Sequence, residues 1–151
     1  MRLALRRKPK AFLLGYGKNA ESRCGPAPRA LDWLTWSEGA VPVSKFYETI
    51  HTMIHKTGGS RESYCRVVPE AFAAGVAVVV EDDYAFPELI EDGVTGYRCK
   101  TSDEMSYRAS ELAFDEPKRK RMVEAAHSVL VNEIASDARC WEPWRRFFEG
   151  A

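Results

Sequence analysis

Two glutamates, Glu62 and Glu70, carry the clearest chemical signal in the sequence, with seven residues between them. An ionised carboxylate only accepts hydrogen bonds, so it can bridge two adjacent hydroxyl donors such as those of a hexose or a ribose. One carboxylate would then hold a hexose and the other a ribose. The spacing also leaves a plainer interpretation open, in which Glu70 pairs with Arg66 at i, i+4 and Glu62 is a solvated loop acid.

The helix that carries Glu70 has a defined position. Pro69 lacks an N–H and fits only within the first turn of a helix, which predicts a start near Arg66 or Val67. The helix then extends to about Ala74 and ends at Gly75. The unpaired N–H groups at its start point back toward the preceding loop, where they favour an anionic group such as a diphosphate.

Short apolar runs alternate along the chain with segments of helical periodicity, which is typical of an α/β fold. Residues 76–80 form a continuous, valine-rich run. A strand that is apolar on both faces belongs in a parallel sheet covered by helices. Residues 11–14 predict another strand, and residues 44–55 fit either one helix or a helix followed by a short strand. Residues 18–42 are the least regular stretch because of their glycines and prolines.

The second half of the chain is predicted to be mostly helical. Ser102 is placed to cap one helix, and Pro117 stands where the first residue of the next helix would be. A terminal segment from Asp137 carries four aromatic residues at helical spacing, which indicate a packing stripe more than a ligand platform. These residues are Trp141, Trp144, Phe147 and Phe148.

Length and charge narrow the class of protein. The 151 residues are enough for one domain with its own core. The 22 basic and 22 acidic residues balance, which excludes a sequence-independent nucleic-acid binder because such a protein needs excess positive charge. No apolar run approaches the ~18 residues of a membrane span, and the basic start does not fit a secretory signal. We expect a cytoplasmic protein, with the inner face of a membrane as a second location, and four reduced cysteines.

The stretch that contains both glutamates resembles the donor-binding half of retaining nucleotide-sugar glycosyltransferases of the GT-B architecture, of the group 1 (family 4) type. The resemblance is strong over residues 57–99, tapers toward residue 148 and is weak before residue 44. The shared features are the pair Glu62 and Glu70, the sequence E-A-F-A-A-G at 70–75, the apolar strand at 76–80 and the sequence P-E-L-I-E-D-G-V-T-G at 87–96.

This resemblance implies a Rossmann-like parallel sheet flanked by helices, the C-terminal half of a GT-B architecture, with an all-helical C-terminal end. Residues 1–151 would form a single nucleotide-sugar donor-binding domain that lacks its first strand and the N-terminal acceptor domain. Such a hexosyltransferase moves a hexosyl unit from a nucleoside diphosphate sugar to an acceptor. In this family catalysis takes place in the cleft between two domains. We therefore expect the isolated chain not to catalyse sugar transfer.

The resemblance also implies roles for individual residues. Glu70 would bind the ribose hydroxyls, Glu62 would support the transferred sugar, and the loop at residues 82–86 would lie beside the donor pocket. The backbone that faces the sugar and the diphosphate would belong to Ser63, Tyr64, Cys65 and Arg66. Ser63 and Cys65 stand where the family commonly has glycines. The resemblance assigns no catalytic residue, and it implies no metal or cofactor because basic side chains and a helix start neutralise the leaving diphosphate.

Other interpretations stay open. The sequence G-x-G-x-x-A at residues 15–20 follows an apolar strand, as in an NAD(P)-binding Rossmann domain, although residues 21–28 break the helix that this fingerprint requires. A non-catalytic interaction module would instead dock through the aromatic residues of the terminal segment. A zinc hydrolase is disfavoured because Thr52, between His51 and His55, stands where the H-E-x-x-H motif has its glutamate.

The identity of the ligands is only partly defined. The expected partners are a nucleotide-sugar and an acceptor, together with a second copy of the chain or the missing N-terminal domain. The sequence does not determine the base, the transferred sugar or the acceptor. The loops that contact the base have no characteristic sequence, and the acceptor would be recognised by the N-terminal domain.

Overall fold

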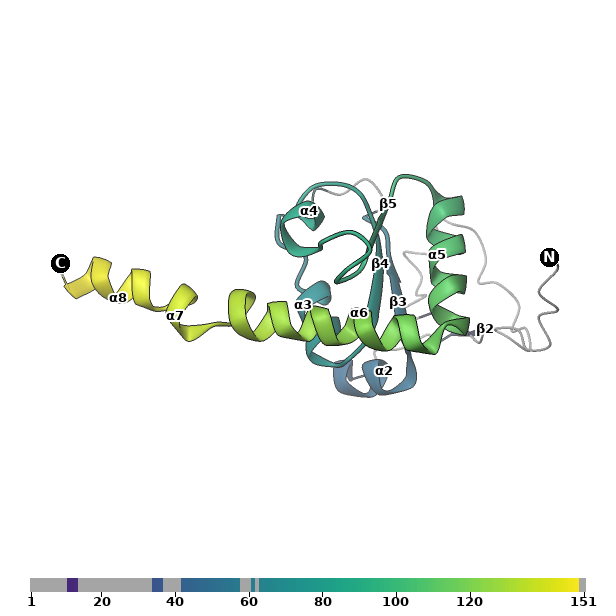
Figure 1. Ribbon diagram of the computed structural model, residues 1–151, viewed down its shortest axis with the longest axis horizontal. Coiled ribbons are helices and arrows are strands. Elements are labelled where there is room, and N and C mark those ends of the chain that lie inside the picture. Colours follow the sequence, from purple (N-terminus) through teal and green to yellow (C-terminus); the bar gives the residue numbers. More distant parts are fainter. Residues whose placement is uncertain (1–10, 14–33, 37–41, 58–60, 62, 150–151) are drawn as a thin grey trace. The chain divides into compact units, whose positions relative to one another are not determined.

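The computed structural model describes residues 11–13, 34–36, 42–57, 61 and 63–149 (Figure 1). The chain divides into two compact units, residues 1–50 and residues 51–151. The glycine fingerprint at residues 15–20 lies outside the described residues.

The first unit contains two parallel strands and a short helix. β1 (Ala11–Leu13) pairs with β2 (Leu34–Trp36). α2 (Val43–Thr49) follows and ends before Ile50, whose backbone is extended. The strand predicted at residues 11–14 is therefore confirmed where the structure describes it.

The second unit is built on a parallel sheet of three strands in the order β3-β4-β5. The strands are β3 (Thr52–His55), β4 (Ala77–Glu81) and β5 (Tyr97–Cys99). Residues 44–55 thus form a helix and then a strand, the second of the two predicted alternatives. β4 is the central strand, and residues 76–80 are all buried as predicted. The α/β class is confirmed.

Helices cover both faces of this sheet (Figure 1). α5 (Ser102–Phe114) contacts all three strands, and α6 (Glu116–Val129) packs against β4 and α5. α3 (Val67–Ala73) packs against β4 and also contacts α6. The short α4 (Phe86–Leu89) follows β4 and lies with α3 on the side of the sheet opposite α5 (Figure 1).

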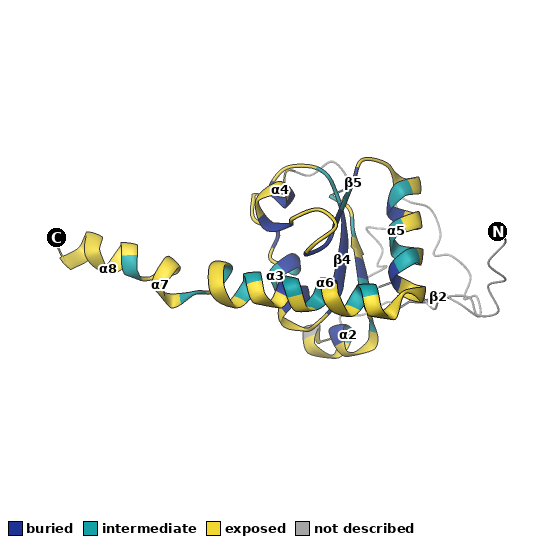
Figure 2. Cartoon of the chain, viewed as in Figure 1, coloured by how far each residue is buried: buried dark blue, intermediate teal, exposed yellow. Residues whose placement is uncertain are grey.

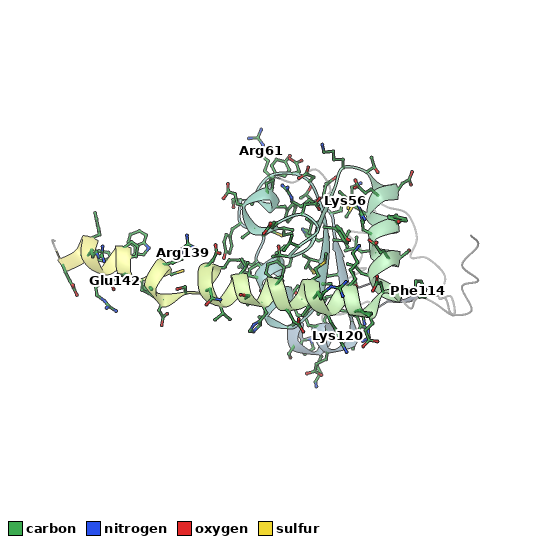
Figure 3. The ribbon with its side chains drawn as sticks, viewed as in Figure 1. Lys56, Arg61, Phe114, Lys120, Arg139 and Glu142 are labelled. Atoms are coloured by element: carbon green, nitrogen blue, oxygen red, sulfur yellow. The ribbon has the colours of Figure 1, made fainter. Side chains whose placement is uncertain are left out.

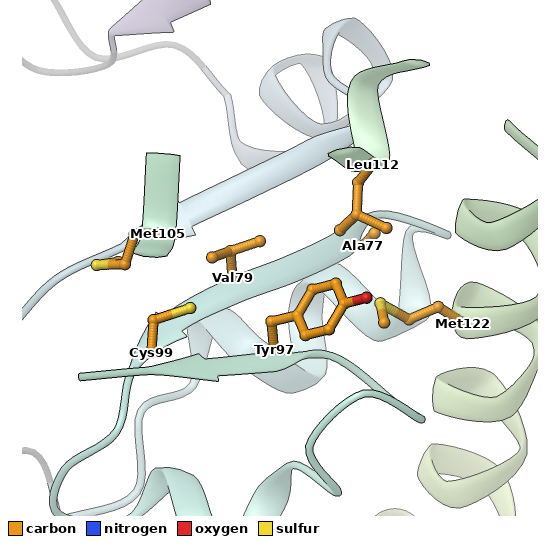
Figure 4. Packing of buried hydrophobic residues seen from close by; sticks show 7 residues of the cluster. All are labelled: Ala77, Val79, Tyr97, Cys99, Met105, Leu112 and Met122. Carbon is orange, nitrogen blue, oxygen red and sulfur yellow. The ribbon is translucent and has the colours of Figure 1, made fainter. Parts of the chain in front are cut away.

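The core lies between the sheet and helices α5 and α6 (Figure 4). Its buried members are Ala77, Val79, Tyr97, Cys99, Met105, Leu112 and Met122. Successive residues of a strand point to opposite faces, so Val78 and Val80 point to the other face, the side of the buried Val68 and Phe72 of α3. Figure 2 shows that burial concentrates on β4 and on the inner sides of the helices. Each large aliphatic side chain buried in this way contributes about 1.5–3 kcal/mol.

The cysteines are free thiols in the described part of the chain. Cys65 and Cys99 are buried, and Cys140 is exposed. Burial raises the pKa of the Cys99 thiol to about 11, so it stays protonated and serves as an apolar core side chain. None of these three cysteines forms a disulfide bond in the described chain.

The helix starts differ slightly from the predictions. Thr101, and not Ser102, caps α5, because the Thr101 hydroxyl accepts a hydrogen bond from the Glu104 N–H at 3.1 Å. Ser102 is already the first helical residue. α6 begins one residue before Pro117, and the Asp115 carboxylate caps it by accepting from the Lys118 N–H at 3.0 Å.

The C-terminal end is helical, as predicted, but its aromatic face is exposed. A π-helical turn (Leu130–Ile134) leads to α7 (Asp137–Cys140) and α8 (Glu142–Glu149). The exposed aromatic side chains are Trp141, Trp144, Phe147 and Phe148. Trp144 stacks on Phe148, with ring centroids 6.2 Å apart. Trp144, Phe147 and Phe148 contact one another. All four side chains are exposed in the described chain, so their interpretation as a packing stripe stays a prediction. No helix within the described residues has both the length and the apolar content to cross a membrane.

A charged cluster joins β5, α5 and α6 at the edge of the core. The Glu111 carboxylate accepts hydrogen bonds from the Tyr97 hydroxyl at 3.0 Å, from Lys118 at 2.7 Å and from Arg108 at 3.2 Å. The Arg108 guanidinium also lies over the Tyr97 ring, 4.5 Å from its centroid. The hydrogen bond from Lys118 lowers the pKa of Glu111 most, although partial burial works in the opposite direction.

Glu111→Gln should lower the free energy of unfolding by about 1 kcal/mol at neutral pH, because it removes the charge that three donors share. The folded-state pKa of Glu111 lies below its unfolded value. The stabilisation is therefore present above the unfolded pKa and is lost as the pH falls through the folded pKa. Urea unfolding at several pH values from neutral into acid measures the free energies of unfolding of wild type and variant, and their difference should shrink as the pH falls. Glu124→Gln, which removes an exposed carboxylate from α6, is the control. Parallel pH profiles for wild type and Glu111→Gln would contradict the assignment.

Gly96 lets the turn before β5 approach the central strand. A β-carbon at this position would lie 2.6 Å from Val78 Cγ2 and 3.1 Å from the Val78 carbonyl oxygen. The Ile90 side chain would be 3.1 Å away. A methyl group therefore has no room without movement of β4.

Gly96→Ala should lower the free energy of unfolding by about 2 kcal/mol through overpacking against β4. Gly93→Asn provides the control. Gly93 has φ +76°, which asparagine tolerates, and a β-carbon at this position would lie 4.0 Å from its nearest neighbour, Tyr97 Cε1. Urea denaturation at one pH compares the two. Equal losses in both variants would show that the contact with Val78 is not the cause.

Candidate functional site

A shallow hollow of about 330 Å³ lies near the carboxyl ends of the strands in the second unit. One wall comes from the segment that follows β3, and the other comes from the loop after β4 together with α4. The lining residues are Arg61, Ser63, Tyr84, Ala85 and Glu88. Open α/β sheets bind ligands at this edge, because the loops that follow parallel strands gather there.

The loops that form the two walls each contain a residue in the left-handed backbone region. Cys65 has φ +51° and Tyr84 has φ +47°. Non-glycine residues adopt this conformation at a cost of order 1–3 kcal/mol, and such residues cluster at functional sites. Cys65 occupies a position where the resemblance implies glycine, and its positive φ gives the physical reason for that preference. The surrounding hydrogen bonds hold it in place, since the Val68 N–H donates to the Cys65 carbonyl at 3.1 Å.

The structure places the sequence-predicted residues unevenly around the hollow. Ser63 lines it, and the exposed Tyr64 follows Ser63 in the chain. Arg66 is exposed and directly precedes α3. Glu70 is half-buried in the first turn of α3 and does not line the hollow. Glu62 lies outside the described residues, so its predicted role stays a prediction.

The predicted limits of the helix that carries Glu70 are confirmed. α3 starts at Val67, with Pro69 in its first turn, and gives way at Ala74 to Gly75, which has φ +71°. Within the described residues no ion pair joins Glu70 to Arg66. The i, i+4 ion pair with Arg66, which the spacing left open as an alternative, is therefore not formed.

Arg61 and Glu88 also line the hollow, although no sequence motif predicted a role for them. The prediction of a loop beside the pocket at residues 82–86 includes Tyr84 and Ala85, and both line the hollow. The available signals were the position of Arg61 next to Glu62 and of Glu88 inside the P-E-L-I sequence.

The carboxylates of Asp82 and Asp83 both interact with neighbouring groups of the chain. Asp82 Oδ1 lies 3.2 Å from Arg98 Nη1, and Asp83 Oδ1 accepts from the Tyr84 N–H at 2.8 Å. Across the described ranges no group of three or more histidine, cysteine, aspartate or glutamate residues is arranged to hold a metal ion.

His51 and His55 do not share a helix. His51 is exposed just before β3, and His55 ends this strand. The His55 ring meets Phe86 edge-on, with centroids 5.8 Å apart, and its buried Nε2 has no hydrogen-bond partner among the described atoms. A helical zinc motif through these two histidines is therefore excluded.

Three solved structures show the same fold at low sequence identity. HepE (Alr3699) of Anabaena, in complex with UDP and glucose, aligns with a TM-score of 0.70 and 16% identity, covering 94% of this chain and 41% of that one. A glycosyltransferase of Rickettsia africae aligns with a TM-score of 0.69 and 15% identity, covering 95% and 40% of the two chains. The C-terminal domain of a group 1 family protein (LpcC) of Francisella tularensis has a TM-score of 0.58 and 18% identity, covering 78% and 60%. This chain thus spans about two fifths of the length of the first two proteins.

A comparison with curated proteins found no match. The family model described as "Glycosyl transferases group 1" matches residues 32–129, which is more than half of the chain. The match covers the sheet of the second unit, the hollow and the segment that carries Glu70. The fold agrees with this match, since the parallel sheet, the flanking helices and the helical C-terminal end are those of GT-B glycosyltransferase structures. The chain belongs to the group 1 glycosyltransferases.

Proposed function

We propose that this chain is the nucleotide-sugar-binding half of a retaining glycosyltransferase, which transfers a hexosyl unit from a nucleoside diphosphate sugar to an acceptor. The hollow between the loops after β3 and β4 is the observation that carries this proposal. It lies within the matched family segment and at the sheet edge where such folds bind ligands.

The side chains around the hollow suit an activated sugar. Arg61 supplies a guanidinium, which matches phosphate oxygens and has no ion-pair partner within the described part of the chain. Glu88 supplies a carboxylate that accepts from sugar hydroxyls, and Ser63 both donates and accepts. The exposed Tyr84 offers an aromatic face to the apolar side of a sugar ring.

Glu70 would serve a different part of the donor. It does not line the hollow, and its carboxylate has no ion-pair partner in the described residues, so it remains free for ribose hydroxyls. We therefore assign Glu70 to the nucleoside and Glu62 with Ser63 to the sugar, and the backbone of Tyr64, Cys65 and Arg66 to the diphosphate and sugar. HepE was solved with UDP and glucose, which makes UDP and UDP-glucose the first ligands to test.

The chemistry of transfer needs charge neutralisation on the departing diphosphate. We assign this to basic side chains such as Arg61 and expect no metal requirement. No residue is assigned as catalytic. We expect the isolated chain to bind the donor without transferring sugar, because the acceptor would be held by a further domain.

A second candidate function is a non-catalytic interaction module, favoured by the exposed aromatic side chains of α8. This surface would meet either an N-terminal domain of the same enzyme or a second copy of the chain. Calorimetric titration separates the two functions, because a pure interaction module gives no saturable heat with UDP, GDP or ADP.

Glu70→Gln should weaken binding of UDP and of UDP-glucose alike, by about tenfold to a hundredfold, since it removes a charge-assisted acceptor worth about 1.5–3 kcal/mol. Isothermal titration of wild type and variant with both ligands measures the change. Glu116→Gln on α6 is the matched control and should bind both ligands like wild type. An unchanged UDP affinity in Glu70→Gln would refute the assignment to the nucleoside.

Glu62→Gln should remove only the additional affinity that UDP-glucose has over UDP. Its carboxylate would contact the sugar, so the titration with UDP should not change. The ratio of the two dissociation constants, measured in wild type and variant, isolates this contribution. Equal losses for both ligands would contradict the division of roles between the two glutamates.

A further inference from the structure

Glu81, the last residue of β4, ties the central strand to the segment that leads into the hollow. Its Oε2 accepts hydrogen bonds from both the backbone N–H of Thr57 at 3.2 Å and the Thr57 hydroxyl at 2.8 Å. The Glu81 side chain is 27% exposed, so these bonds are shielded from water on most sides. Two bonds to one residue restrict both the position and the rotation of Thr57.

Lys56 extends this link to α5. Its ammonium nitrogen lies 3.9 Å from Glu81 Oε1 and donates to the Ser102 hydroxyl at 3.0 Å. The chain next to Thr57 is thus held by β4 on one side and by the first turn of α5 on the other. Figure 3 labels Lys56 and Arg61 at the end of the unit where the strands finish.

A fixed Thr57 limits where the lining residues can go. Arg61 follows four residues later, and an extended chain spans at most about 3.6 Å per residue, so Arg61 stays within about 14 Å of Thr57. On the far side of Ser63, the buried Cys65 fixes the chain again through the hydrogen bond from Val68. Arg61 and Ser63 therefore lie between two anchored points.

We propose that Glu81 is a positioning residue for donor binding, which through Thr57 holds Arg61 and Ser63 in the geometry that receives the diphosphate and sugar. The inference rests on the proposed function. A binding group held in place before the ligand arrives loses less conformational entropy on binding, so the anchor increases affinity without touching the ligand. Glu70 lies on α3 beyond Cys65, so binding of the nucleoside does not depend on the anchor.

Two pairs of variants test the anchor. Thr57→Val removes the hydroxyl that donates to Glu81 and keeps the shape of the side chain, and Thr57→Ser restores the hydroxyl. Glu81→Ala removes the acceptor altogether, and Glu116→Gln controls for the loss of one carboxylate at an exposed position. NMR titrations with UDP-glucose and with uridine separate the diphosphate and sugar from the nucleoside.

Thr57→Val and Glu81→Ala should reduce the affinity for UDP-glucose about fivefold to tenfold, because each variant loses about one hydrogen bond that holds the loop in its binding geometry. Both variants should leave the affinity for uridine unchanged. Thr57→Ser and Glu116→Gln should bind both ligands like wild type. A purely structural role would leave both affinities intact or reduce them by the same factor, and either result overturns the inference.

Amide hydrogen exchange without ligand provides an independent measurement. Exchange of the backbone amide of residue 57, which donates to Glu81, should accelerate in Thr57→Val and in Glu81→Ala and remain slow in Thr57→Ser. Unchanged exchange in all variants overturns the anchor. A wild-type chain that binds neither ligand refutes the proposed function, and with it the role in donor binding, even where the exchange rates respond.

Discussion

The structure of the second unit depends on the burial of residues 77–80 of β4. This strand has hydrogen-bonded neighbours on both sides and helices over both faces, so its valines lose contact with water entirely. Burial on this scale supplies the main favourable free energy and also determines the topology, because a parallel strand must be reached through a crossover connection. α3 is the crossover between β3 and β4, and it carries Glu70. The most buried strand thus determines where a candidate ligand-binding carboxylate lies.

Parallel strands also place polar groups together at one edge. The chain leaves the core at the ends of β3 and β4, and the residues there can no longer satisfy their hydrogen bonds within the sheet. Glu81 accepts hydrogen bonds from the backbone N–H and the hydroxyl of Thr57, and Asp82 forms an ion pair with Arg98. The left-handed backbone at Cys65 and Tyr84 adds strain to the same edge. These contacts hold the described residues at the starts of both loops, at the edge where open α/β sheets bind ligands.

The C-terminal helices differ from the rest of the second unit. The faces of α5 and α6 toward the sheet are buried, whereas α8 presents its aromatic side chains to solvent. Phe148 is 77% exposed, although an isolated soluble domain ordinarily covers a cluster of four aromatic rings. The amphipathic pattern of α8 is typical of a helix that packs against a surface, yet its aromatic side chains are exposed in the described chain.

The sequence by itself determined the local elements whose cause is local. Pro69 and Gly75 set the two ends of α3, and the run of valines made β4 a doubly buried strand. The two glutamates pointed to the family only together with the sequences at 70–75 and 87–96 and the apolar strand between them. Only the tertiary structure decided which distant residues meet. Arg61 and Glu88 share a hollow, Thr101 rather than Ser102 caps α5, and Thr57 binds Glu81 from 24 residues away. The physical reason is that backbone propensity and periodicity act over a few residues, whereas hydrogen-bond partners, pocket walls and exposed faces follow from how the sheet and its helices close around the core.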